Sequence, residues 1–170
     1  MPGSPAACSA SASALRQPPS IQSQPLAPEL AARDAGTEVT LAPILAAHAR
    51  LASVADAMVV EGVGGWAAPL SATLDQADLV RALRLPVVLV IGLRLGCLSH
   101  ALLSARALAA DGLRLAGWIG SHVDPHMARV DDNLAMLRAR LPAPCWGVLP
   151  HAPDAAPASL ASYLRIPVMA

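Results

Sequence analysis

The sequence predicts an α/β fold in which a parallel sheet carries helices on both faces. Strand-like apolar runs alternate with segments of helical period between residues 57 and 149. The central run, residues 86–91 (PVVLVI), is continuous and rich in β-branched side chains, which is typical of a strand buried on both faces. The 170 residues are enough for one domain with a hydrophobic core.

Each expected element has its own local signal. Thr40 is a candidate N-cap, and Asp111-Gly112 and the glycine-rich segment 62–65 are typical of turns. Helical spacing or composition predicts helices at residues 40–54, 75–83, 99–110 and 126–141, with a last helical turn at 160–164. Short apolar runs predict strands at residues 57–61, 86–91, 113–119 and 145–149.

Composition separates a tail from a domain. Residues 1–28 are rich in Ala, Ser, Pro and Gln and show no sustained period, so we expect a disordered or poorly ordered tail. The α/β domain is expected to occupy residues 29–170.

Charge and cysteine usage exclude several classes of protein. Lys+Arg and Asp+Glu are both 12, and this zero net charge argues against a general binder of nucleic acid or of anionic membranes. The longest strand-like apolar run, residues 86–93, is far too short to span a bilayer. Cys8, Cys97 and Cys145 are isolated, which argues against a zinc site and is typical of a reducing, cytoplasmic location.

The segment after the first expected strand is the most informative. Glu61 ends that strand and is followed by glycines, so its carboxylate is placed to reach a metal ion or nucleotide at the edge of the sheet. Glycine lets backbone N–H groups approach an anionic ligand closely. The alternative interpretation is a tight turn that carries a solvated Glu.

The segment 92–100 follows the next strand and opens a helix. The free N–H groups of a helix start bind anions, and Arg94 adds a cation beside them. The alternative is that Ser99 is a plain N-cap and Cys97 a packed apolar residue. The three histidines His122, His126 and His151 do not have the spacing of a metal site.

Taken together, these segments resemble the dethiobiotin synthetase family. The matching stretches are residues 60–66 (VEGVGGW), 69–70 (PL), 85–90 (LPVVLV), 94–97 (RLGC) with His100, 117–119 (GWI) and 146–150 (WGVLP). They occur in the family's order from about residue 26 to the C-terminus.

The resemblance implies a P-loop NTPase-like fold and an ATP- and Mg²⁺-dependent ligase of biotin biosynthesis. Such enzymes close the ureido ring of dethiobiotin from 7,8-diaminopelargonic acid and CO₂, and they act as homodimers. By motif match Glu61 resembles the magnesium ligand, and Gly62, Val63 and Gly64 resemble the nucleotide-side loop. Further matches are the adenine-side residues Ser121, His122, Pro150, His151 and Ala152, and the substrate-carboxylate residues Arg94, Gly96, Cys97, Leu98 and Ser99.

The sequence also departs from the family pattern. The family's GxxxxGK[ST] phosphate-binding motif does not occur, and the chain has no lysine. Ser99 and Ser121 stand at positions where the family has asparagine. We therefore expect a domain incomplete at its N-terminus, marginally stable and poorly active by itself. Two alternatives are a non-catalytic remnant that dimerises through the helix at 96–110, and another ATP-dependent ligase or ATPase of the P-loop class.

Overall fold

Three parallel strands form one sheet in the computed structural model of the protein, which describes residues 26–167. The strands are β1 (Val87–Gly92), β2 (Leu115–Ser121) and β3 (Cys145–Leu149), and they lie in the order β1-β2-β3. The helices are α1 (Pro28–Asp34), α2 (Leu41–Ala52), α3 (Gln76–Leu83), α4 (Cys97–Ala110), α5 (Val130–Arg140) and α6 (Pro157–Leu160), followed by the 3₁₀ turn η1 (Ala161–Tyr163). The predicted α/β class with a parallel sheet is confirmed.

The register of the sheet brings the carboxyl ends of the strands together. Gly92 at the end of β1 lies beside Ser121 at the end of β2, which lies beside Leu149 at the end of β3. In parallel α/β sheets ligands bind beyond this edge, where loops lead into helices. The three loops that follow the strands therefore start from one edge.

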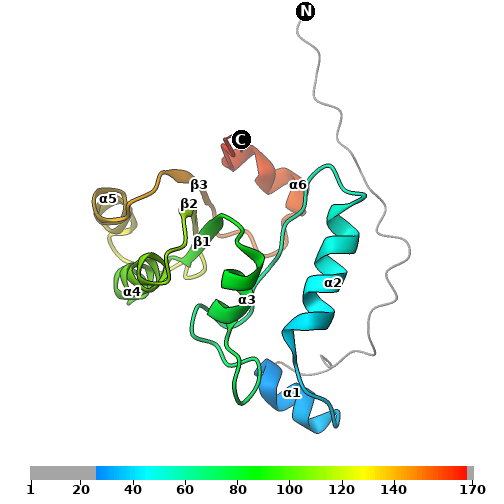
Figure 1. Ribbon diagram of the computed structural model, residues 1–170. Coiled ribbons are helices and arrows are strands. Elements are labelled where there is room, and N and C mark those ends of the chain that lie inside the picture. Colours follow the sequence, from blue (N-terminus) through cyan, green and yellow to red (C-terminus); the bar gives the residue numbers. More distant parts are fainter. Residues whose placement is uncertain (1–25, 168–170) are drawn as a thin grey trace, which may run out of the picture.

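The hydrophobic core lies between the sheet and the pair α4 and α5. Trp118 of β2 and Leu137 of α5 are completely buried, and Cys97 and Ala101 of α4 pack in the same cluster. Burial of these apolar side chains is the main force that holds the two helices on this face. In Figure 1, α2, α3 and α6 lie on the other side of the strands from α4 and α5.

Helix ends follow the local sequence closely. At α3, Asp75 caps the helix by accepting from the Asp78 N–H at 3.0 Å, and Asp78 accepts in return from the Asp75 N–H at 2.9 Å. At α4, Gly96 is the N-cap with a φ of 93°, a conformation that glycine adopts without strain. The predicted stop at Asp111-Gly112 is confirmed.

Residues 57–61 are not a strand, which corrects the prediction. The segment is irregular, Val59 is 94% exposed, and it pairs with no strand among residues 26–167. An apolar run becomes a strand only where a neighbour supplies hydrogen bonds and cover. In the described sheet the outer edge of β1 is likewise unpaired, and Val90 there is 62% exposed.

Other boundaries differ from the prediction by a few residues. α4 begins at Cys97 rather than at residue 99, α5 begins at Val130 rather than at 126, and β2 runs to Ser121 rather than to 119. The helix α1 was not predicted. Thr40 does precede α2, but its side chain makes no capping hydrogen bond. The expected tail of residues 1–28 lies almost wholly outside the described residues.

The C-terminal turn closes the far edge of the sheet. The predicted last helical turn is present as α6 and η1, and Leu164 pairs with Gly147 of β3 in an antiparallel bridge. The Arg165 N–H donates to the Trp146 carbonyl at 2.7 Å. Within residues 26–167 no helix combines the length and the apolar character needed to cross a bilayer.

Candidate functional site

Backbone hydrogen bonds tie together the loops that leave the three strands. The Leu93 N–H donates to the Ser121 carbonyl at 2.7 Å, and the His122 N–H donates to the Leu149 carbonyl at 3.0 Å. The Asp124 N–H reaches the Leu93 carbonyl at 3.4 Å. These bonds continue the pairing between neighbouring strands just beyond the sheet and hold the first residues of the loops in place.

The predicted adenine-side residues meet at this edge. His151 Nδ1 donates to the His122 carbonyl at 3.0 Å, and the two imidazole rings lie edge to face with their centroids 6.5 Å apart. Ser121, at the end of β2, is half-buried beside them. His122 Nε2 is buried and has no hydrogen-bond partner within residues 26–167. A buried polar atom without a partner is costly to the fold.

Pro150 and Ala152 flank His151 in the loop after β3, and both are half-buried while His151 itself is exposed. The structure thus brings five of the predicted residues, from two loops far apart in sequence, into one corner.

The predicted substrate-carboxylate residues surround the start of α4. Arg94 and Ser99 are exposed, Leu98 is half-buried, and Cys97 is only 2% exposed and packs in the core. The helix starts two residues earlier than expected, so Ser99 is the third helical residue and Gly96 is the N-cap. The interpretation of Ser99 as a plain N-cap is wrong, whereas the packed role of Cys97 is confirmed.

The glycine loop, residues 61–65, is exposed along its whole length and contacts the start of α3. Gln76, the first residue of α3, is only 6% exposed, and its Oε1 accepts weakly from the Val63 N–H at 3.5 Å. A Cβ built on Gly62 would lie 2.8 Å from Gln76 Nε2, and one on Gly64 would lie 2.8 Å from the Ala68 Cβ. Glycine at both positions therefore allows the loop to approach its neighbours closely.

An open cavity of about 540 Å³ borders the glycine loop. Val63 and Gly64 form one side, and the remaining lining comes from Leu26, Ala27, Pro28, Ala67, Ala68 and Pro69. The lining is mostly apolar.

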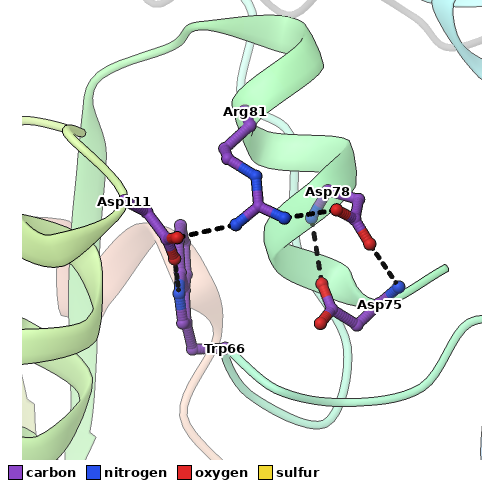
Figure 2. Close-up of polar contacts among 5 residues, drawn as sticks. All are labelled: Trp66, Asp75, Asp78, Arg81 and Asp111. Atoms are coloured by element: carbon purple, nitrogen blue, oxygen red, sulfur yellow. Dashed lines mark hydrogen bonds and ion pairs between the residues drawn. The ribbon is translucent and has the colours of Figure 1, made fainter.

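A network of polar side chains anchors the far end of the glycine loop (Figure 2). Trp66 Nε1 donates to Asp111 Oδ2 at 2.7 Å, and Arg81 donates to Asp111 Oδ1 at 2.7 Å and to Asp78. The pKa of Asp78 is held below its ordinary value, first by the Asp75 N–H and then by the Arg81 guanidinium. The hydrogen bond to Asp78 in turn raises the pKa of Arg81.

This network was not predicted. The sequence indicates Asp111 only as a helix stop, and Gln76 only as part of a helix. Their contacts join residues 13 to 45 positions apart, which no local pattern reveals. The Asp75–Asp78 spacing does signal the helix start.

The structure does not bring all the predicted residues together. Among the hydrogen bonds of residues 26–167, none links Glu61 to the corner of Ser121, His122 and His151 or to the start of α4. Glu61 is exposed, and the described residues contain no group of three or more metal-ligating side chains. One exposed carboxylate still fits a Mg²⁺ ion whose other ligands are phosphate oxygens and water.

Comparison with known proteins defines the class. The family described as "AAA domain" (AAA_26) matches residues 6–159, and the chain belongs to this family. The match agrees with the predicted P-loop NTPase-like α/β fold.

Several similar proteins carry a more specific name. The chain is 63% identical over 143 residues to the ATP-dependent dethiobiotin synthetase BioD of Xanthomonas oryzae pv. oryzae (strain PXO99A). The aligned residues cover 84% of this chain and 64% of that protein. It is 62% identical over 141 residues to the protein of the same name from Xylella fastidiosa (strain 9a5c), with 82% and 62% covered. The predicted resemblance is confirmed. The chain spans less than two thirds of the length of these relatives.

Proposed function

We propose that the protein acts in biotin synthesis as an ATP- and Mg²⁺-dependent ligase that closes the ureido ring of dethiobiotin. The substrates are 7,8-diaminopelargonic acid, CO₂ and ATP. The observation that carries the proposal is the 63% identity to a relative named ATP-dependent dethiobiotin synthetase, extending over 84% of this chain. The diamino acid takes up CO₂ as a carbamate, and ATP phosphorylates the carbamate with release of ADP. The second amine then attacks the mixed anhydride, which closes the ring and expels phosphate.

The corner at the ends of β2 and β3 is proposed to hold the adenine of ATP. Ser121 can offer one hydrogen bond, and the buried His122 Nε2 is free for another within the described structure. His151 packs edge to face on His122 and donates to its carbonyl, and these contacts hold the loops after β2 and β3 together. Pro150 and Ala152 supply apolar contact beside it.

The glycine loop is proposed to serve the phosphate end of the nucleotide. Gly62, Val63 and Gly64 are exposed and would approach the phosphates through their backbone, and Glu61 would hold Mg²⁺. The ion neutralises phosphate charge when bound. No step is assigned to a lysine or to a GxxxxGK[ST] loop, because the chain contains neither.

The start of α4 is proposed to bind the substrate carboxylate. The Leu98 and Ser99 N–H groups lie in the first turn, where the helix has no internal acceptors for them, whereas the Cys97 N–H donates to the Arg94 carbonyl at 3.0 Å. Arg94 adds a cation one turn earlier. In the family this helix start serves the partner subunit's site, so a homodimer is part of the proposal, as is a cytoplasmic location.

An ATP titration with and without Mg²⁺ tests the proposal. We expect the protein to bind ATP, and Mg²⁺ to tighten the binding. In the Glu61→Gln variant, the factor by which Mg²⁺ lowers the Kd for ATP should be about tenfold smaller, because a neutral amide is a poor magnesium ligand. The matched control is Glu38→Gln, which alters an exposed Glu outside the glycine loop and should behave as the wild type.

Adding the diamino acid distinguishes the alternatives. ADP release that requires both 7,8-diaminopelargonic acid and bicarbonate supports the proposal. ADP release whose rate does not depend on the diamino acid indicates another ATPase or ligase of the P-loop class. A dimer in native mass measurements that binds no ATP indicates a non-catalytic remnant, and contradicts the proposal for this chain.

A further inference from the structure

The glycine loop has few anchors of its own. All five of its residues are exposed, and the Val63 N–H makes only the weak 3.5 Å bond to Gln76. The next residue, Trp66, is half-buried and donates its indole N–H to Asp111 at 2.7 Å. A short bond to a carboxylate is the stronger type of hydrogen bond. Trp66 is therefore the firm attachment at the far end of the loop.

Asp111 is held in turn from the other side. Both of its carboxylate oxygens are used, Oδ2 by Trp66 and Oδ1 by Arg81, each at 2.7 Å (Figure 2). Arg81 also pairs with Asp78, which belongs to the capping box of α3. Trp66, which directly follows the glycine loop, is thus linked through Asp111 to the end of α4 and through Arg81 to α3.

The position of Asp111 is unfavourable for the helix that carries it. It is the C-cap of α4, where the helix dipole presents its negative end, and the last turn of α4 contains no basic residue. A carboxylate there opposes the dipole. Its use as an acceptor for Trp66, with Arg81 as counter-charge, is a physical reason for an acidic residue at this place.

We propose that Asp111 is a positioning residue, which fixes Trp66 and through it holds the glycine loop in the orientation that binds the phosphate end of the nucleotide. The inference rests on the proposed function in its last step, the nucleotide, but the link from Asp111 to the loop stands on the geometry alone.

Nuclear magnetic resonance tests the link directly, without any ligand. The chain has three tryptophans and 11 glycines, so indole and glycine amide signals are few. Trp118 and Trp146 have buried indole nitrogens with no partner among residues 26–167, whereas that of Trp66 is bonded to a carboxylate. We expect Asp111→Ala to shift the Trp66 indole signal and the Gly62, Gly64 and Gly65 amides, and to leave the Trp118 indole and the Gly120 amide in place.

Two further variants complete the series. Asp111→Asn keeps an acceptor for Trp66 but loses the ion pair with Arg81, so its shifts should be smaller than those of Asp111→Ala. The control Asp132→Asn removes the same charge from an exposed pair with Arg129 on α5 and should leave the loop signals unchanged. Trp66→Phe assigns the indole signal and removes the donor while keeping an aromatic ring, so it tests the same link should Asp111→Ala fail to fold.

Binding of Mg²⁺-ATP tests the last step. We expect the Kd to rise about tenfold in Asp111→Ala and in Trp66→Phe, the scale of one lost hydrogen bond to a charged group, and to stay unchanged in Asp132→Asn. Unchanged loop signals in Asp111→Ala and Trp66→Phe, or shifts spread equally over the core, would overturn the inference, as would moved loop signals with an unchanged Kd. Failure of the wild type to bind Mg²⁺-ATP overturns the proposed function instead, while the ligand-free spectra still decide whether Asp111 holds the loop.

Discussion

Single residues in this protein are constrained by backbone as much as by side chains. Gly147 in β3 has a φ of 155°, and a Cβ there would run into the Tyr163 carbonyl oxygen and lie 3.1 Å from the Leu164 Cα. These are main-chain atoms of the bridge that closes the sheet, so they cannot turn aside as a flexible side chain would. Gly36, in contrast, has a φ of 65° and open space around it.

Gly147→Ala should therefore lower the free energy of unfolding by about 2–4 kcal/mol, through both strain and collision. Gly36→Ala, the control, carries only the cost of the left-handed conformation, about 1 kcal/mol. Urea denaturation measures both. Equal losses in the two variants would show that Leu164 and Tyr163 move away from β3 without cost.

At the scale of elements, α3 shows how charge and helix geometry work together. Asp78 accepts the Asp75 N–H of the capping box and also pairs with Arg81, and these contacts lower its pKa. An acid whose pKa is lower in the folded state than in the unfolded state stabilises the fold once it is ionised. That contribution is present above the unfolded pKa of about 3.8 and is lost as the pH falls through the folded value.

We accordingly expect Asp78→Asn to be less stable than the wild type at neutral pH, and the difference to shrink as the pH falls below about 4. Unfolding curves recorded across this range measure it. Asp131→Asn, which removes one exposed carboxylate from α5, provides the baseline for the loss of a charge. Curves for Asp78→Asn and the wild type that stay parallel down to acid pH would contradict this account.

At the scale of the whole molecule, local pattern predicted the elements that have a local cause. The β-branched run of β1 and the Asp111-Gly112 stop of α4 have signals within a few residues, and the parallel sheet follows from the alternation of strands and helices. Residues 57–61 have the same kind of apolar run, yet they are an exposed loop, because a strand needs a partner that its own sequence does not reveal. The clamp of Trp66, Arg81 and Asp111 escaped prediction for the same reason.

In the candidate site, too, the sequence predicts what has a local motif and misses what depends on distant contacts. Motif order places Ser121, His122 and His151 near strand ends, and the structure brings His122 and His151 into contact. It does not join Glu61 to them, and the role of each remains a proposal. Gln76, which accepts from the Val63 N–H, and Asp111, which accepts from Trp66, have no motif of their own.

The core that unites α4, α5 and the sheet should dominate the stability of the molecule. Leu137 of α5 is fully buried in it, so Leu137→Ala should lower the free energy of unfolding by about 2–5 kcal/mol. That is a large part of the total for a domain of this size. Val54→Ala, at a side chain that is 82% exposed, should change it by less than about 0.5 kcal/mol. Similar effects of the two substitutions would mean that α5 is not held by this core.

The order of the strands has a consequence for how the chain is made. β1, β2 and β3 lie in the sheet in the order in which they leave the ribosome, and each joins its neighbour through one helix, α4 or α5. A growing chain can therefore pair β1 with β2 and pack α4 before β3 has been synthesised, and β3 then adds to an edge that already exists. Synthesis and assembly of the sheet run in the same direction.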